Sequence, residues 1–286
     1  MLSVCLLCAC ARPAAHLQPT ATPAITPASS PSPEPSPVTT SQSHVFVIVM
    51  ENHSYARALA GSYTAALAKK YSVATDYHGV SNPSLPNYLA LTSGSTWGIA
   101  DDGYHRLPAG GIGAQLTTAG IQWRAYMEGM TNGCFNSPYP YALKHNPFAY
   151  YGSGCPSQVV SFSHFATDMK KDVPRFVWIT PGLCHDGHDC STATADQWLA
   201  QTVPQILATD AWKTNGLLLI TWDEGDDSAN HVLTLAIQSN PIERASAHAY
   251  NHYSLLATVE DRLGLARLGK AAAATAMTDL VSNPGQ

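Results

Sequence analysis

Charged side chains are scarce in this sequence. Only 12% of its 286 residues are Asp, Glu, Lys or Arg, and the formal net charge at pH 7 is −5. So few basic residues leave no positive surface of the kind that binds nucleic acid. An anionic substrate would therefore have to be attracted by a metal ion or by local dipoles.

A long hydrophobic run is also missing from the start of the chain. The apolar residues 1–10 are too few to cross a membrane, and no Lys or Arg is found among them. The segment is compatible with a clipped export signal. Leu7-Cys8-Ala9-Cys10 also resembles a bacterial lipobox, in which Cys10 would carry the lipid that attaches the protein to a membrane. Plain secretion and lipid attachment both stay open.

Residues 11–43 lack any periodicity of apolar residues and are dominated by Pro, Ser, Thr and Ala. Such a segment cannot bury a core, so we expect a disordered tether. The chain as a whole is 45% hydrophobic, which is enough for a sizeable core. We therefore expect residues 44–286 to form one folded domain.

Four cysteines lie beyond the tether: Cys134, Cys155, Cys184 and Cys190. None of the four belongs to a C-x-x-C pair, which argues against a zinc site. Their even number, in a protein that carries an export-like start, indicates two disulfides. Three pairings are possible. Cys134 with Cys155 and Cys184 with Cys190 close the shortest loops, and these are the pairs we predict.

Apolar, β-branched runs alternate with helical patterns along this domain. Runs typical of strands cover residues 44–50, 73–77, 121–127, 175–180, 216–222 and 232–237. Helices are expected at about 55–70, 112–119, 193–207 and 252–264, and after the turn that contains Ser84. No internal repeat is present. The alternation predicts an α/β fold, a mainly parallel sheet sandwiched by helices.

Polar residues follow the carboxyl ends of the predicted strands, where α/β proteins bind ligands. Glu51 and Asn52 follow the first strand, and Asp223 and Glu224 follow the strand at 216–222. Carboxylate and amide oxygens are hard ligands that suit a divalent cation. These four residues are therefore candidate metal ligands, and Ca, Mg, Mn and Zn all stay open. Taken alone, residues 223–227 could equally form a solvated acidic turn, and Glu51-Asn52 a capping pair.

Ser84 lies in the turn SNPSLPNY, where an apolar helix begins, so it occupies the expected N-cap position. A hydroxyl there points toward free N–H groups and the positive end of the helix, which favours an attacking alkoxide. A metal ion beside Ser84 would stabilise the alkoxide and neutralise a phosphoryl oxygen. Taken alone, however, such a serine is more often only a cap.

Phosphoryl transfer requires a placed nucleophile, cations, and hydrogen-bond donors to the equatorial oxygens. Candidates for those donors are Asn52, Asn87, His145 and His188. A histidine near the leaving oxygen can also act as a general acid. In a purely structural alternative, His145 is a loop residue and Asp189 fixes the His188 imidazole within a disulfide-closed turn.

Six motifs then occur in order along the chain: MENHS at 50–54, PSLPNYLAL at 83–91, KHNPF at 144–148, HD at 188–189, TWDEGD at 221–226 and NHYS at 251–254. Together they resemble the bacterial phosphoesterase family over about residues 44 to 270. That family contains secreted acid phosphatases, phosphatidylinositol-type phosphatases and phospholipases C. The resemblance implies an alkaline-phosphatase-like core.

The resemblance also implies roles for individual residues. The metal ligands would be Glu51, Asn52, Ser84, Asp223 and Glu224, with Ser84 also the nucleophile. Asn87, His145 and His188 match positions near the phosphoryl group. His252 matches a position that orients a carboxylate, and Asp189 would orient His188.

We therefore expect a secreted or envelope-anchored, metal-dependent acid phosphatase, monomeric, with its catalytic domain at residues 44–286. It would hydrolyse small-molecule or lipid phosphate monoesters through a phosphoserine on Ser84. A phospholipase C-type phosphodiesterase would use the same nucleophile and metal, and a non-catalytic lipoprotein that binds phosphate esters would use the same donors. A metal-independent serine hydrolase is disfavoured because no G-x-S-x-G elbow is present.

Overall fold

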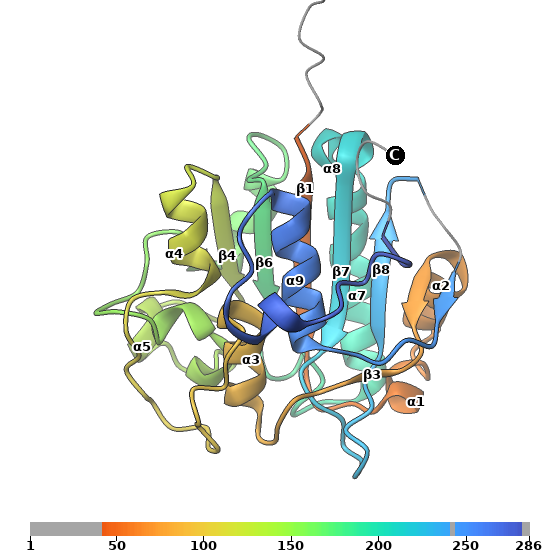
Figure 1. Ribbon diagram of the computed structural model, residues 1–286, viewed down its shortest axis with the longest axis horizontal. Helices are drawn as coiled ribbons and strands as arrows, with labels where there is room; N and C mark the ends of the chain where they lie inside the picture. The colour runs from red at the N-terminus through yellow and green to blue at the C-terminus, as the bar shows by residue number, and fades with distance from the viewer. Residues whose placement is uncertain (1–41, 241–243, 282–286) are drawn as a thin grey trace, which may run out of the picture. The chain divides into compact units, whose positions relative to one another are not determined.

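The computed structural model describes residues 42–240 and 244–281 (Figure 1). The predicted signal segment, the lipidated Cys10 and nearly all of the predicted tether lie outside these residues. None of the helices in the described part of the chain is long and apolar enough to cross a membrane.

An eight-stranded sheet forms the centre of the domain, in the order β5-β4-β6-β1-β7-β8-β2-β9. Its strands are β1 His44–Met50, β2 Ser72–Ala74, β4 Trp123–Met127, β5 Val159–Ser161, β6 Phe176–Thr180, β7 Gly216–Trp222, β8 Thr234–Gln238 and β9 Ala245–Ser246. A separate two-stranded sheet pairs β3, Tyr77–His78, with β10, Tyr250–Asn251. The predicted α/β fold with a mainly parallel sheet is confirmed.

β1 lies in the middle of the sheet, parallel to β6 on one side and to β7 on the other. All residues of β7, and all of β1 after His44, are buried, as the continuous apolar runs predict for strands covered on both faces. β8 is antiparallel to β7, and β2 is antiparallel to β8. Because no helix lies between β7 and β8, the chain has no crossover there and returns in the opposite direction.

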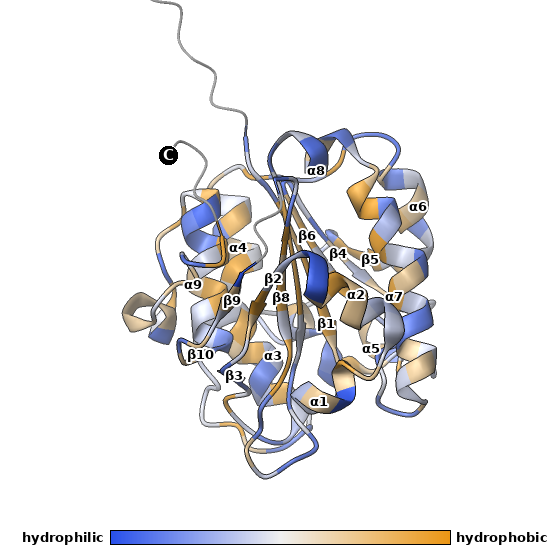
Figure 2. Ribbon diagram, turned by 90° about the vertical axis from the view of Figure 1, so that its right-hand side faces the viewer, coloured by the Kyte–Doolittle hydropathy of each residue, from blue (hydrophilic) through white to orange (hydrophobic). Residues whose placement is uncertain are grey.

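Helices cover both faces of this sheet, as Figure 2 shows with the apolar strands edge-on between them. α3, α4 and α9 lie on one face, and α2, α6 and α7 on the other (Figures 1 and 2). The helices are α1 Tyr55–Ala58, α2 Ser62–Lys70, α3 Ser84–Ser93, α4 Gly111–Thr118, α5 Gly133–Asn136, α6 Phe165–Asp168, α7 Thr192–Leu207, α8 Asp210–Asn215 and α9 His252–Leu263.

The single helix predicted at about 55–70 is wrong, because the chain breaks into α1 and α2 around Gly61. The Asp196 carboxylate, from α7, accepts hydrogen bonds from the backbone N–H groups of Tyr63 and Thr64. It thus caps the start of α2 from a distant part of the chain. A Cβ at Gly61 would lie 2.5 Å from Asp196 Oδ1, so this close approach requires glycine.

Both predicted disulfides are present. Cys134 pairs with Cys155 within the segment between β4 and β5. Cys184 pairs with Cys190 and closes a short loop between β6 and α7. This second loop lies at the carboxyl end of a central strand, which is where the candidate site is found.

Candidate active site

The site lies at the carboxyl edge of the parallel strands. Glu51 directly follows β1, Asp223 directly follows β7, and Asp186 lies in the disulfide loop after β6. β6, β1 and β7 are adjacent and parallel, so their ends bring these three carboxyl groups to one place. Glu51, Asp186 and Asp223 have no exposed surface.

Ser84 is the first residue of α3 and its side chain faces this cluster. Its Oγ donates a hydrogen bond to Glu51 Oε2 at 3.2 Å. The predicted N-cap position is wrong, because Pro83 is the capping residue and makes no side-chain bond. The backbone N–H of Leu85 instead donates to Asp102 Oδ1 at 3.0 Å, which leaves the Ser84 hydroxyl free for the site.

Asn52 contacts carboxylates that follow both β1 and β7. Its backbone, with φ of 46°, is in the left-handed region that Asn tolerates better than most residues. The backbone N–H donates to Asp223 Oδ1 at 3.1 Å. One terminal atom of its amide lies 3.1 Å from Glu224 Oε1 and 3.2 Å from Glu51 Oε2. If that atom is nitrogen it donates to both carboxylates, and if it is oxygen the three acceptors converge as they do around a cation.

Several buried oxygens in this group have no hydrogen-bond partner among the described residues, including Asp223 Oδ2 and Glu224 Oε2. Burial raises the pKa of Asp223 to about 7, and burial together with Asp223 raises the pKa of Glu224 to about 8. Burial, then the charges of Asp223 and Asp186, hold the pKa of Glu51 well above its usual range. Unpartnered carboxylate oxygens of this kind fit a hard divalent cation, so the predicted ligand set suits a metal ion.

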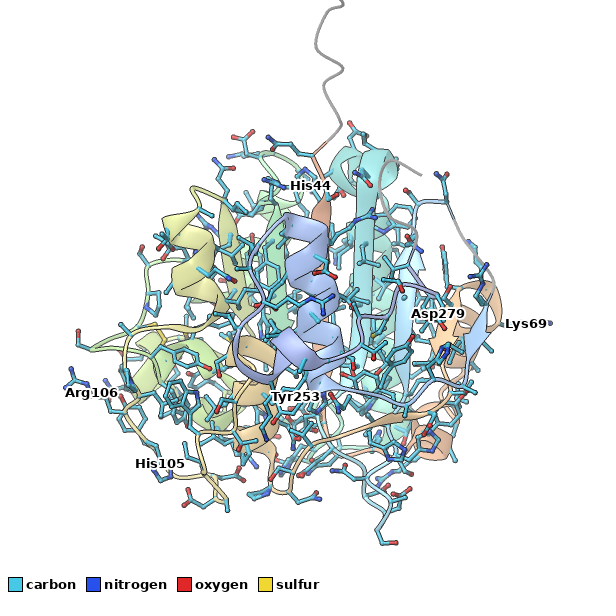
Figure 3. All side chains as sticks on the ribbon, in the orientation of Figure 1. His44, Lys69, His105, Arg106, Tyr253 and Asp279 are labelled. Carbon is cyan, nitrogen blue, oxygen red and sulfur yellow. A yellow bond between two sulfur atoms is a disulfide. The ribbon has the colours of Figure 1, made fainter. Side chains whose placement is uncertain are left out.

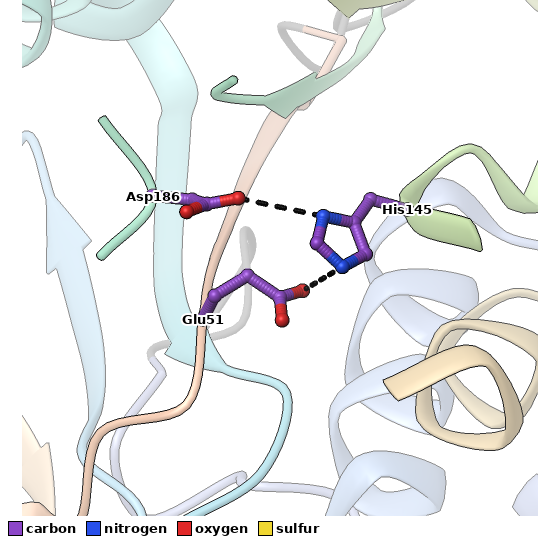
Figure 4. Close-up of side chains that lie close together, drawn as sticks. All are labelled: Glu51, His145 and Asp186. Carbon is purple, nitrogen blue, oxygen red and sulfur yellow. Dashed lines mark ion pairs between the residues drawn. The ribbon is translucent and has the colours of Figure 1, made fainter. Parts of the chain in front are cut away.

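The two ring nitrogens of His145 face two carboxylates, one of Glu51 and one of Asp186 (Figure 4). Its Nε2 is 3.2 Å from Glu51 Oε1 and its Nδ1 is 3.4 Å from Asp186 Oδ2, although neither contact is aligned as a hydrogen bond. The ring stacks on Tyr88 and is 1% exposed. Burial, then the charge of Lys144, lowers its pKa well below the usual range.

This position does not support the predicted contact between His145 and a phosphoryl group. The imidazole contacts Glu51 Oε1, whereas Ser84 contacts Oε2 of the same carboxylate. Glu51, His145 and Asp186 place one possible ligand atom each within 4.8 Å of the others, so they could hold a metal ion themselves. These three side chains are buried, and together they form what we call the buried wall of the site.

The mouth of the site is formed by Lys144, Asp102 and His188, whose side chains are 21%, 30% and 28% exposed. Lys144 Nζ lies 3.0 Å from Asp102 Oδ2, 3.3 Å from His188 Nε2 and 3.4 Å from Ser84 Oγ. Neither Lys144 nor Asp102 was predicted as a site residue. Lys144 stands in the KHNPF motif, which could have indicated it, whereas Asp102 lies in none of the six motifs.

His188 Nδ1 lies 2.7 Å from Asp189 Oδ1. A carboxylate only accepts, so Nδ1 carries the proton, and the ammonium group of Lys144 only donates, so Nε2 presents its lone pair. His188 in this state is therefore not ready to act as the general acid that we expected. The backbone N–H of His188 donates to Asp186 Oδ1 at 2.8 Å, which ties the mouth to the buried wall.

Asn87 is not placed to bind a substrate. Its Oδ1 accepts hydrogen bonds from the N–H groups of Val80 and Ser81, and its Nδ2 donates to the carbonyl groups of Ser81 and Pro83. All of its hydrogen-bonding capacity is thus used within the loop that precedes Ser84. Asn87 positions that loop.

His252 contacts Asp223, but through the backbone carbonyl group, and not through the carboxylate that we expected it to orient. Since a carbonyl oxygen only accepts, Nε2 carries the proton and Nδ1 accepts from the Tyr77 hydroxyl at 3.0 Å. Burial lowers the pKa of His252 to about 4, so the ring is neutral at pH 7. It fixes the backbone that carries Asp223.

Asp186 was also missed as an individual residue. The sequence signal that could have indicated it is its place in the loop closed by Cys184 and Cys190, directly after a core strand. We expected His188 of that loop near the phosphoryl group but did not select Asp186. Burial raises the pKa of Asp186 to about 7.

Comparison with known proteins agrees with this geometry. The model of the Phosphoesterase family matches residues 60–245. A phosphate-repressible acid phosphatase of Penicillium chrysogenum is 29% identical over 244 residues, which cover 78% of this chain and 59% of that protein. A phosphatidylinositol-3-phosphatase of Mycobacterium tuberculosis is 30% identical over 251 residues, which cover 83% of this chain and 82% of that protein. The chain spans about three-fifths of the length of the fungal acid phosphatases it matches.

Solved structures resemble the fold. A member of the alkaline phosphatase superfamily from Vibrio parahaemolyticus superposes with a TM-score of 0.58 and 12% identity, covering 78% of this chain and 67% of that one. The phosphonate monoester hydrolase of Silicibacter pomeroyi superposes with a TM-score of 0.56 and 11% identity, covering 84% and 76%. At such low identity these matches bear on the fold alone, and they confirm the predicted alkaline-phosphatase-like core.

Proposed function

Because this chain belongs to the phosphoesterase family, we propose that it is a metal-dependent phosphomonoesterase of the acid phosphatase type, with Ser84 as its nucleophile. The observation that carries this proposal is the hydrogen bond from Ser84 Oγ to Glu51 Oε2, in a buried group of oxygens at the N-terminus of α3. The relatives named as acid phosphatases and as a phosphatidylinositol-3-phosphatase support the same reaction class.

In the first step, Ser84 Oγ attacks phosphorus and the bond from phosphorus to the ester oxygen breaks. Glu51 Oε2 is the acceptor nearest to the hydroxyl proton, at 3.2 Å. The departing alkoxide takes a proton from water at the partly exposed mouth and leaves as an alcohol. In the second step, water attacks phosphorus, the Ser84 Oγ–P bond breaks, and inorganic phosphate is released.

Glu51, Asn52, Asp223 and Glu224 would hold a divalent ion beside Ser84, and its charge would neutralise the phosphoryl oxygens and favour the serine alkoxide. His252 and Asn87 are not among these ligands, and each positions part of the site. The first fixes the backbone of Asp223 and the second fixes the loop before Ser84.

The substrates proposed are phosphate monoesters with a small-molecule or lipid leaving group, and a phosphoinositide is one case, by analogy with the mycobacterial relative. We also propose that the protein is exported, either secreted or attached to the cell envelope through Cys10, and monomeric. Two disulfides favour an oxidising compartment.

The direct test measures phosphate release from p-nitrophenyl phosphate by the full chain, with and without a chelator, and after Mg, Ca, Mn or Zn is restored. Ser84→Ala should abolish turnover without changing the thermal unfolding midpoint, whereas Ser93→Ala, at the other end of the same helix, should stay active. Rapid quenching should also yield a phosphopeptide that contains Ser84. Turnover retained by Ser84→Ala, or insensitive to chelator, would refute the proposal, and release limited to one equivalent per chain would indicate a binding protein.

A further inference from the structure

Lys144 brings a positive charge to the one hydroxyl that the proposed reaction uses. Its Nζ lies 3.4 Å from Ser84 Oγ, and that hydroxyl in turn donates to Glu51 Oε2 at 3.2 Å. Arg57, another cation that follows β1, is bound to Asp226 at 2.6 Å. Lys144 is therefore the cation placed to act on the chemistry.

The three hydrogens of its ammonium group have three acceptors: Asp102 Oδ2, His188 Nε2 and Ser84 Oγ. The first two are held by the protein. Asp102 also accepts from the N–H of Leu85, and His188 is held by Asp189. Lys144 is thus fixed from two sides, with its third donor directed at the nucleophile.

The loop 94–110, which carries Asp102, lies at the same edge of the domain as the carboxyl ends of the strands. Figure 3 shows this through His105 and Arg106 of the loop, which lie at the edge opposite His44 at the start of β1. Ser84 itself is 1% exposed, whereas Lys144 is partly exposed. The ammonium group therefore lies beside Ser84 Oγ on a side chain that solvent reaches more easily than it reaches the serine.

We propose that Lys144 is a catalytic residue that donates to a nonbridging phosphoryl oxygen and makes the site prefer doubly charged monoesters to singly charged diesters. The inference rests on the proposed function of Ser84. A monoester dianion has three nonbridging oxygens that share two negative charges, whereas a diester has two such oxygens that share one, so an added cation stabilises the bound monoester more than the bound diester. Asp102 is a positioning residue that holds Lys144 for this contact.

The first arm of the test needs no turnover. Binding of inorganic phosphate and of dimethyl phosphate to the metal-loaded full chain is measured by calorimetry at pH 8, where phosphate is mainly the dianion. Lys144→Gln should weaken phosphate binding by about 30-fold or more and dimethyl phosphate binding by less than about fivefold, since the dianion has both a higher charge and an additional nonbridging oxygen for the ammonium group. Lys144→Arg, which keeps the charge, should recover most of the difference, and Lys170→Gln, an exposed lysine outside the site, should change neither.

The second arm measures kcat/KM for p-nitrophenyl phosphate and for bis-p-nitrophenyl phosphate. Lys144→Gln should lower the monoester value by about 100-fold, the usual effect of losing one donor to a developing oxyanion, and should lower the ratio of monoester to diester turnover by at least tenfold. Asp102→Asn should lower the same ratio by a smaller factor, because Lys144 keeps its charge and loses only one of the groups that hold it. Circular dichroism establishes that each variant is folded.

The inference would be overturned if Lys144→Gln lost the same factor in affinity for phosphate and dimethyl phosphate and the same factor in kcat/KM for the two esters. It would also be overturned if neither quantity changed, even with an active wild-type enzyme. Failure of wild-type phosphate binding would overturn it as well. Wild-type protein that binds phosphate through Lys144 but releases none from either ester would instead refute the proposed function and leave Lys144 as a phosphate ligand.

Discussion

The buried carboxyl groups of the site should make the metal-free protein less stable as the pH rises. Burial raises the pKa of Asp223 to about 7. The folded protein therefore keeps a proton on Asp223 at pH values where the unfolded chain has lost it. The stability that comes from this proton is complete below about pH 4 and is lost as the pH rises through the folded pKa.

The magnitude follows from the linkage between protons and folding. Each pH unit well inside this window lowers the free energy of unfolding by about 1.4 kcal/mol for one such group, and the slope falls off near the folded pKa. The titration of Asp223 alone therefore lowers it by about 2 kcal/mol between pH 5 and pH 7. For a domain of this size, that loss lowers the unfolding midpoint by about 4 to 8 °C. Glu224, whose pKa is raised to about 8, acts in the same direction.

The assay is differential scanning calorimetry of the chelator-treated full chain at pH 5, 6 and 7. Asp223→Asn removes the charge and should flatten the dependence on pH. Asp210→Asn is the matched control, because the Asp210 side chain is fully exposed and should leave the dependence as it is. A divalent ion should raise the midpoint, and more at pH 7 than at pH 5, because protons compete for the same oxygens.

Two results would refute this reasoning. One is a metal-free wild-type protein that unfolds at the same temperature at pH 5 and pH 7. The other is an ion that stabilises Asp223→Asn as much as wild type, since that ion would not be bound at the predicted site.

The remaining predictions concern residues that position the site. Asn87→Ala should lower the free energy of unfolding by about 2 kcal/mol, because half-buried backbone N–H and carbonyl groups lose their partner, and urea unfolding measures this; a loss below about 1 kcal/mol would contradict the role given to Asn87. Cys184→Ser with Cys190→Ser should cost about 2 kcal/mol in stability but at least tenfold in kcat/KM for p-nitrophenyl phosphate, because the loop carries Asp186 and His188. Unchanged kcat/KM in a folded double variant would show that the loop keeps its geometry without the bond.

Much of the fold could be read from local patterns. The continuous apolar runs of β1 and β7 predicted buried central strands, because a strand covered on both faces shows no polar alternation. Those strands end directly at Glu51 and Asp223, so the carboxyl edge of the sheet was predictable as well. The short loops of the two disulfides were also accessible, because closeness along the chain limits which cysteines can meet.

Other features depend on segments that meet only after folding. Asp196 caps α2 from α7 where the first helical run breaks, and although Gly61 permits this approach, the residues between 55 and 70 do not reveal that a carboxylate from α7 will be there. The direction of β8 depends on the missing helix after β7 more than on its own residues. A strand run looks the same in either direction, so sequence could not distinguish the two.

The roles of the individual residues in the site were likewise decided by the tertiary structure. The sequence by itself determined which chemical groups are available: a serine at the start of a helix, and hard oxygen ligands at strand ends. Only the packing placed His145 against Glu51, engaged the whole amide of Asn87 in hydrogen bonds, and brought Asp102 to Lys144 at 3.0 Å across a sequence separation of 42 residues. Motifs record residue types at fixed spacings, whereas the direction of a side chain and the contacts between distant loops are set by the packing of the whole domain.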